Sequence, residues 1–144
     1  MGYTNYWRIR KIEAYKQALP LVASDLKELL PQLPPLAGWD GRGEPTLKGW
    51  RIAFNGVEPE ECEPFLLEEW PRGAPGFCKT REKPYDLAVK AALVLLKWHS
   101  EAIAPYAVEV RSDGGLTDWD KACELVVEEL GYPVDPAWTL GRED

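Results

Sequence analysis

The sequence has few of the side chains that enzymes use for catalysis. It contains one histidine, His99, and three cysteines at wide spacings, Cys62, Cys78 and Cys123. Ser-His-Asp and Cys-His sites need an imidazole as the base, and zinc sites need paired cysteines or several histidines. We therefore expect free thiols and a structural histidine, and we predict a non-enzymatic protein with no catalytic residues, no metal and no cofactor.

The sequence also lacks a long apolar run. The longest run, residues 91–96, is bounded by Lys90 and Lys97, whereas a membrane-spanning helix needs roughly 20 apolar residues. The first residues do not show the charged segment followed by an apolar segment that marks a secretory signal. We expect no membrane association and a location in the cytoplasm.

Basic residues are outnumbered in this chain. There are 17 Lys and Arg residues against 24 Asp and Glu residues, which gives a formal net charge of −7. An acidic chain repels nucleic-acid phosphates at long range, so a basic protein surface is favoured as partner over general DNA affinity. Direct contact with nucleic acid then requires a local basic face.

The length of 144 residues and the hydrophobic content of 45% are typical of one folded domain. We predict a single globular domain over residues 1–132, followed by a loose C-terminal tail over residues 133–144. We expect the protein to be a monomer.

Apolar periodicity in the first third of the chain predicts a strand followed by a long helix. Residues 3–10 alternate as in a strand, and apolar residues recur every three or four positions over residues 12–33. Pro20 removes a backbone donor inside this helix, so we expect a kink or break near residue 19. Four prolines and four glycines in residues 31–49 predict a long loop without regular structure.

The rest of the pattern predicts strands over residues 50–55, 65–70 and 107–111 and helices over 84–103 and 117–130. The first two of these strands are expected to pair as a hairpin. The last helix is expected to begin with a capping box of Thr117 and Asp120 and to end at Gly131. The order of elements indicates an α+β fold, with an antiparallel sheet of about four strands, helices on one face, and ferredoxin-like order plus a C-terminal helix.

One segment interleaves cations with aromatic residues, and further tryptophans lie in or beside loops. Such a composition is typical of binding surfaces for protein or nucleic acid, and tryptophan and arginine are enriched at interface hot spots. The net charge favours protein as the partner. The predicted partner-binding residues are Trp39, Trp50, Trp70, Arg72, Phe77, Lys79, Arg81, Lys83 and Tyr85.

Three carboxylates surround a glycine turn, Asp113, Asp118 and Asp120. Magnesium can bind through one or two carboxylates, so a magnesium-dependent phosphotransfer enzyme is an alternative hypothesis. Turn formation by Asp113 and stabilisation of a helix start by Asp118 and Asp120 account for all three residues without a metal, and we favour that interpretation.

Several short motifs carry a resemblance to a known family, namely residues 1–7, 52–56, 77–80, 83–86 and 112–114 with Trp119. With them the chain resembles a family of small proteins of phages and mobile elements, many of which open with Met-Gly-Tyr-Thr-His-Tyr-Trp. The likeness spans most of the chain. Asn5 stands where that opening has histidine, so any role of the family's histidine is lost here.

The resemblance implies a phage-encoded regulator of transcription. It suggests the member type that binds host RNA polymerase and inhibits or redirects initiation through the flap of the β subunit and the σ factor, in the host cytoplasm. The alternative function is a nucleic-acid-binding accessory protein of a phage or mobile element that uses the same aromatic and cationic segment.

Overall fold

The computed structural model describes residues 2–71 and 76–142. In chain order the elements are β1 (Thr4–Ile9), α1 (Ile12–Leu29), η1 (Leu30–Gln32), β2 (Leu36–Ala37), β3 (Thr46–Lys48), β4 (Arg51–Gly56), β5 (Phe65–Glu68), β6 (Gly76–Lys79), α2 (Asp86–Ile103), β7 (Val108–Ser112), η2 (Leu116–Trp119), α3 (Asp120–Leu130) and α4 (Pro136–Leu140). Within the described ranges, no helix combines the length and apolarity that crossing a membrane requires.

The strands form two antiparallel sheets. In the first sheet β1 lies between β6 and β7, and in the second β4 pairs with β2, β3 and β5. The predicted α+β class is confirmed, and so is the predicted hairpin, now β4 and β5. One sheet was expected; the structure has two, because β1 pairs with β7 and with β6, which was not predicted, and not with the strands around β4.

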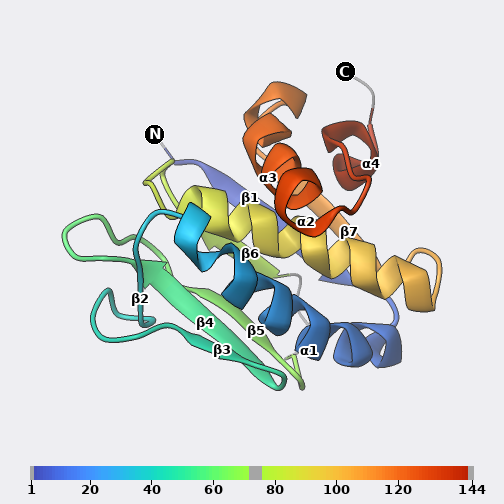
Figure 1. Cartoon of the computed structure of the whole chain (residues 1–144), viewed down its shortest axis with the longest axis horizontal. Helices are drawn as coiled ribbons and strands as arrows, with labels where there is room; N and C mark the ends of the chain where they lie inside the picture. The colour runs from blue at the N-terminus through green and yellow to red at the C-terminus, as the bar shows by residue number, and fades with distance from the viewer. Residues whose placement is uncertain (1, 72–75, 143–144) are drawn as a thin grey trace.

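Helix α2 is the centre of the molecule. Figure 1 shows α1 and α2 running side by side, with α3 and α4 on one side of them and the sheet of β4 on the other. Every residue from Ala88 to Leu96 is buried, because α1, α3 and the sheet of β1 and β7 surround the helix. The helix predicted over residues 84–103 therefore forms at the core of the fold.

The predicted break at Pro20 is wrong. Helix α1 continues from Ile12 to Leu29 through Pro20, which lies on the exposed side of the helix. Its buried neighbours Leu19 and Val22 pack into the core on both sides of the proline. Water can satisfy a carbonyl that loses its partner on an exposed side, so tertiary packing keeps the helix continuous.

Two predicted irregular segments contain regular structure. Residues 31–49 were expected to be a loop, but β2 and β3 form there by pairing with β4. The tail after residue 132 was expected to be loose, but α4 forms there and Thr139 is fully buried. Both elements depend on partners distant in the sequence, which local composition does not reveal.

The last large helix begins differently from the prediction. A 3-10 turn, η2, precedes α3, and the carboxylate of Asp118 accepts the Gly115 N–H at 2.8 Å. The capping box of Thr117 and Asp120 is therefore wrong. Gly131 ends α3 with a φ of 76°, as predicted, since glycine adopts this left-handed conformation without strain.

Candidate functional site

The predicted partner-binding residues do not form one surface. Trp39, Trp50, Trp70 and Phe77 have exposed fractions of 63%, 58%, 70% and 61%. Arg81 is exposed, and Lys79 and Lys83 are partly exposed; Arg72 lies outside the described residues. The exposed members fall in different parts of the fold, and the neighbours of each part decide what it can bind.

Tyr85 is a correction to the predicted surface. Its side chain is fully buried, and its hydroxyl donates to the carbonyl of Glu63 at 2.5 Å. Burial, followed by the nearby thiols of Cys78 and Cys62, raises the pKa of the Tyr85 hydroxyl. The residue directly precedes α2 and turns its ring into the core beside Gly56, so it cannot contact a partner.

Trp50 and Trp70 belong to the same end of the β4–β5 hairpin. Trp50 precedes β4, and its carbonyl accepts the N–H of Glu69, the residue before Trp70. Trp39 lies at the other end of β4, because its carbonyl accepts the side-chain amide of Asn55. The structure therefore brings Trp50 and Trp70 to one end of the hairpin and separates Trp39 from them.

Cations accompany both indoles at this end of the hairpin. The Lys16 ammonium lies 3.5 Å from the centroid of the Trp70 ring, and that of Lys48 lies 5.3 Å from the Trp50 ring. Cations over an indole face are attracted by the ring quadrupole. We call Lys16, Lys48, Trp50, Arg51 and Trp70 the tryptophan corner. Its indoles stay largely exposed, each with a lysine ammonium beside the ring.

A second surface is the solvent-facing side of the sheet that contains β1. Side chains alternate across a strand, so one set of residues faces α2 and the other faces solvent. Tyr6 lies opposite both Phe77 and Arg111, Arg8 opposite Glu109, and Thr4 opposite Lys79. We call these residues the outer sheet face: Thr4, Tyr6, Arg8, Phe77, Lys79, Glu109 and Arg111.

Two residues of this face, Phe77 and Lys79, were predicted from the sequence as partner-binding residues. Tyr6, Arg8 and Arg111 were not. The alternation of the first strand carried the missing signal. With Trp7 directed into the core, Tyr6 and Arg8 on the opposite parity must face solvent. The pairing of Tyr6 with Phe77 and Arg111 depends on strand register, which no local pattern fixes.

A buried polar network supports the outer sheet face from behind. Asp86 accepts hydrogen bonds from the Asn5 amide at 2.8 Å and the Thr80 hydroxyl at 2.6 Å, and its second oxygen lies 2.8 Å from the Lys90 ammonium. The Ser112 hydroxyl donates to the side-chain amide oxygen of Asn5 at 2.7 Å. The network ties β1 and β7 to α2 and holds the strands in one register.

Lys90 stays charged in this buried position. Burial disfavours its ammonium, but hydrogen bonds to Asp86 and Tyr3 outweigh that effect and raise the pKa of Lys90. Its ammonium also donates to the carbonyl of Asp118 at 3.1 Å. The Asp86–Lys90 pair therefore has local partners for both charges, which a buried ion pair needs in order to be tolerated.

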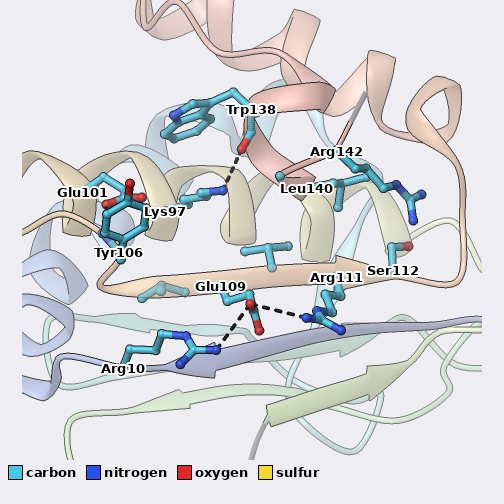
Figure 2. Close-up of a pocket in the computed structure, with 13 residues that line it drawn as sticks. Arg10, Lys97, Glu101, Tyr106, Glu109, Arg111, Ser112, Trp138, Leu140 and Arg142 are labelled. Atoms are coloured by element: carbon cyan, nitrogen blue, oxygen red, sulfur yellow. Dashed lines mark hydrogen bonds and ion pairs between the residues drawn. The ribbon is translucent and has the colours of Figure 1, made fainter. Parts of the chain in front are cut away.

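A cleft of about 610 Å³ runs along the edge of β7, facing α4 and the end of α2 (Figure 2). Figure 2 shows Arg10 and Arg111 directed at Glu109. One guanidinium nitrogen of each arginine lies 3.5 Å from a carboxylate oxygen of Glu109. The Lys97 ammonium donates to the carbonyls of Trp138 and Thr139 at 2.6 and 3.0 Å, and burial lowers the pKa of Lys97.

Among the described strands β7 pairs with β1 alone, and its other edge faces this cleft. The backbone N–H of Arg10 donates to the carbonyl of Ala107, and the backbone N–H of Asp113 donates to the carbonyl of Thr4. The odd-numbered residues from Ala107 to Asp113 therefore direct their backbone groups toward β1. By alternation, Val108, Val110 and Ser112 direct their backbone groups outward. All three line the cleft.

A smaller hollow of about 390 Å³ lies on the outer sheet face. Its lining residues are Tyr6, Trp7, Arg8, Glu109 and Arg111. Glu109 and Arg111 line the cleft as well, so the two hollows meet at β7. Cationic side chains thus extend from the outer sheet face around the edge of the sheet.

The lone histidine has a structural setting. His99 Nε2 lies 2.6 Å from Asp25 Oδ2, which also accepts the hydroxyl of Tyr132 at 2.9 Å. These contacts join α2, α1 and the segment after α3. The Sγ atom of Cys123 lies 3.8 Å from the hydroxyl oxygen of Thr139.

The acidic residues of the glycine turn also have local partners. Asp113 accepts the Thr4 N–H at 3.0 Å and the Tyr6 hydroxyl at 3.3 Å, and Asp118 accepts the Gly115 N–H. In the part of the chain that the structure describes, no group of three or more His, Cys, Asp or Glu side chains is placed to hold a metal ion. The contacts of Asp113 and Asp118 organise the turn and the start of η2.

Comparison of the chain with protein-family models, with curated proteins and with solved structures finds no match in any of the three. The resemblance to phage proteins therefore remains a prediction from the sequence.

Proposed function

We propose that this protein is a non-enzymatic regulator that docks on host RNA polymerase through the tryptophan corner. The observation that carries the proposal is the pair of indoles at one end of the β4–β5 hairpin, exposed by 58% and 70% and accompanied by lysines. Tryptophans in such a setting are typical interface hot spots.

The exposed indole area is large enough to matter for affinity. A tryptophan side chain offers about 150–250 Å² of surface, and apolar burial is worth about 25 cal/mol per Å². Covering the exposed part of Trp50 or Trp70 therefore contributes roughly 3 kcal/mol per ring before the costs of association. A contribution of this size per ring is that of an interface hot spot.

The identity of the partner comes from the sequence resemblance. It implies the β-subunit flap and the σ factor of host RNA polymerase. A protein that binds one arrangement of polymerase and σ more tightly than another shifts the enzyme toward the favoured arrangement. Altered initiation follows from this differential binding alone.

The test is co-elution with purified host polymerase holoenzyme, combined with transcription initiation in vitro. We expect the protein to co-elute and to change initiation, and the double variant Trp50→Ala/Trp70→Ala to bind at least tenfold more weakly. Trp39→Ala is the matched control, because Trp39 is equally exposed but lies at the other end of β4.

Failure of the wild-type protein to co-elute would reject polymerase as the partner. If the double variant bound and acted as the wild type does, the tryptophan corner would not be the docking surface. Thermal melting of each variant separates a loss of binding from a loss of folding.

A further inference from the structure

We propose that the outer sheet face binds single-stranded nucleic acid, with bases stacked on Tyr6 and Phe77 and phosphates held by the surrounding cations. This site is separate from the tryptophan corner, so the polymerase proposal and this one can fail independently. The inference assigns to the chain a ligand class, a set of stacking residues and a set of phosphate contacts.

The aromatic pair has the geometry of a stacking platform. Tyr6 and Phe77 lie directly opposite each other on neighbouring antiparallel strands, with exposed fractions of 39% and 61%. In the described part of the chain, neither ring stacks on another aromatic ring. Exposed aromatic residues on adjacent strands are the means by which sheet surfaces hold unpaired bases.

Arg111 extends this row by one strand. It lies opposite Tyr6 on the other side of β1, so Phe77, Tyr6 and Arg111 form a line across the sheet. Neighbouring strands are about 4.8 Å apart, and guanidinium planes stack on bases as aromatic rings do. The line therefore offers successive positions for bases of one strand.

The charge of this face is opposite to that of the whole chain. Arg8, Lys79 and Arg111 lie on the face, and Arg10 is at its margin. Nearby carboxylates have local partners: Glu109 pairs with Arg10 and Arg111, Asp113 accepts from Thr4 and Tyr6, and Glu63 accepts the Lys79 N–H. The face and its margin thus hold four cationic side chains and three carboxylates, whereas the whole chain has a net charge of −7.

The shape of the face favours a single strand over a duplex. The hollow of about 390 Å³ beside Tyr6 meets the cleft along β7, which Arg10 also lines. A strand whose bases rest on Tyr6 and Phe77 can place its phosphates near Arg8 and Lys79, which lie on either side of this row. Paired bases in a duplex cannot reach these rings, because their faces are stacked on each other.

The experiment measures fluorescence anisotropy of labelled dT12 and rU12 with the purified protein at low salt, with a duplex of equal length for comparison. We expect binding of the single strands and at least tenfold weaker binding of the duplex. Phe77→Ala and Tyr6→Ala should each weaken binding about 5- to 150-fold, the effect of losing one stacked base. Tyr6→Phe keeps the ring and should retain binding.

Salt dependence tests the phosphate contacts separately. Removing one contact should lower the slope of log affinity against log salt by about 0.7 for a single strand, so we expect this change for Arg8→Gln. Trp39→Ala and the double variant Trp50→Ala/Trp70→Ala should bind oligonucleotide as the wild type does, because those residues lie off this face.

No binding of either oligonucleotide at low salt would overturn the inference, as would equal affinity for the duplex. Wild-type affinity of the correctly folded Phe77→Ala and Tyr6→Ala variants would also overturn it. If these variants lost polymerase binding while the wild type bound no oligonucleotide, the outer sheet face would be a protein-docking surface instead.

Discussion

At the scale of single residues, Asp86 has more structural partners than its sequence position suggests. One carboxylate holds Asn5 of β1, Thr80 after β6 and Lys90 on α2, all within 2.8 Å. Asp86 is also the first residue of α2, where a carboxylate stabilises the helix dipole. Its partners come from long-range folding and carry no local signal.

Replacing Asp86 should be strongly destabilising. Asp86→Ala leaves the buried Lys90 ammonium without its ion-pair partner, and breaking a buried pair on one side costs about 3–5 kcal/mol. We expect a decrease of that size in the free energy of unfolding, measured by urea denaturation. Glu124→Ala, on the exposed side of α3, serves as the control and should change stability by less than about 0.5 kcal/mol.

The cysteines differ in accessibility, and this predicts their reactivity. Burial raises the pKa of Cys78 to about 12 and that of Cys123 to about 11, so both remain thiols at neutral pH. Only the thiolate reacts with disulfide reagents. At pH 8 we expect Cys62, which is partly exposed, to be labelled first in the native protein.

In a thiol-labelling assay, Cys62→Ser should remove the fast phase. Unfolding in urea should expose the other two thiols to the reagent. Fast labelling of Cys78 in the folded Cys62→Ser variant would contradict the burial of this side chain. The raised pKa values of Cys78 and Cys123 slow their labelling, because they reduce the thiolate fraction at every pH below about 11.

At the scale of elements, α4 shows what holds a short helix in place. Five residues cannot form a stable helix alone, yet α4 is capped by Asp135, which accepts the Trp138 N–H at 2.8 Å. Lys97 on α2 binds its carbonyls, and Trp98 packs edge-on against Trp138 with ring centroids 6.0 Å apart. Composition alone predicted a loose tail there.

Removing the cap of α4 should loosen the helix without unfolding the domain. Asp135→Ala should lower stability by about 1 kcal/mol, the usual value of an N-cap. Hydrogen exchange should show faster exchange at residues 136–140 than in the wild type, while amides of α2 stay protected. Asp135→Asn should restore the wild-type pattern, and equal exchange in the alanine variant would show that the cap is not needed.

At the scale of the whole molecule, the sequence predicted the elements better than their assembly. Strong periodicity located α1, α2 and the β4–β5 hairpin because apolar side chains repeat at the period of the element. The division into two sheets could not be predicted, since it depends on β6 pairing with β1. The same limit applies to the candidate sites, because Trp50, Trp70 and Phe77 were found individually but their neighbours were not.

The edge of β7 has one further consequence. A strand with unpaired amides and carbonyls invites another chain to extend its sheet, which leads to aggregation. Here α4 lies alongside that edge, and Arg10, Glu109 and Arg111 place charged groups around it. A second copy would have to displace a helix and strip water from these charges, so we expect the same C-terminal segment that shapes the cleft to hinder extension of the sheet by another chain.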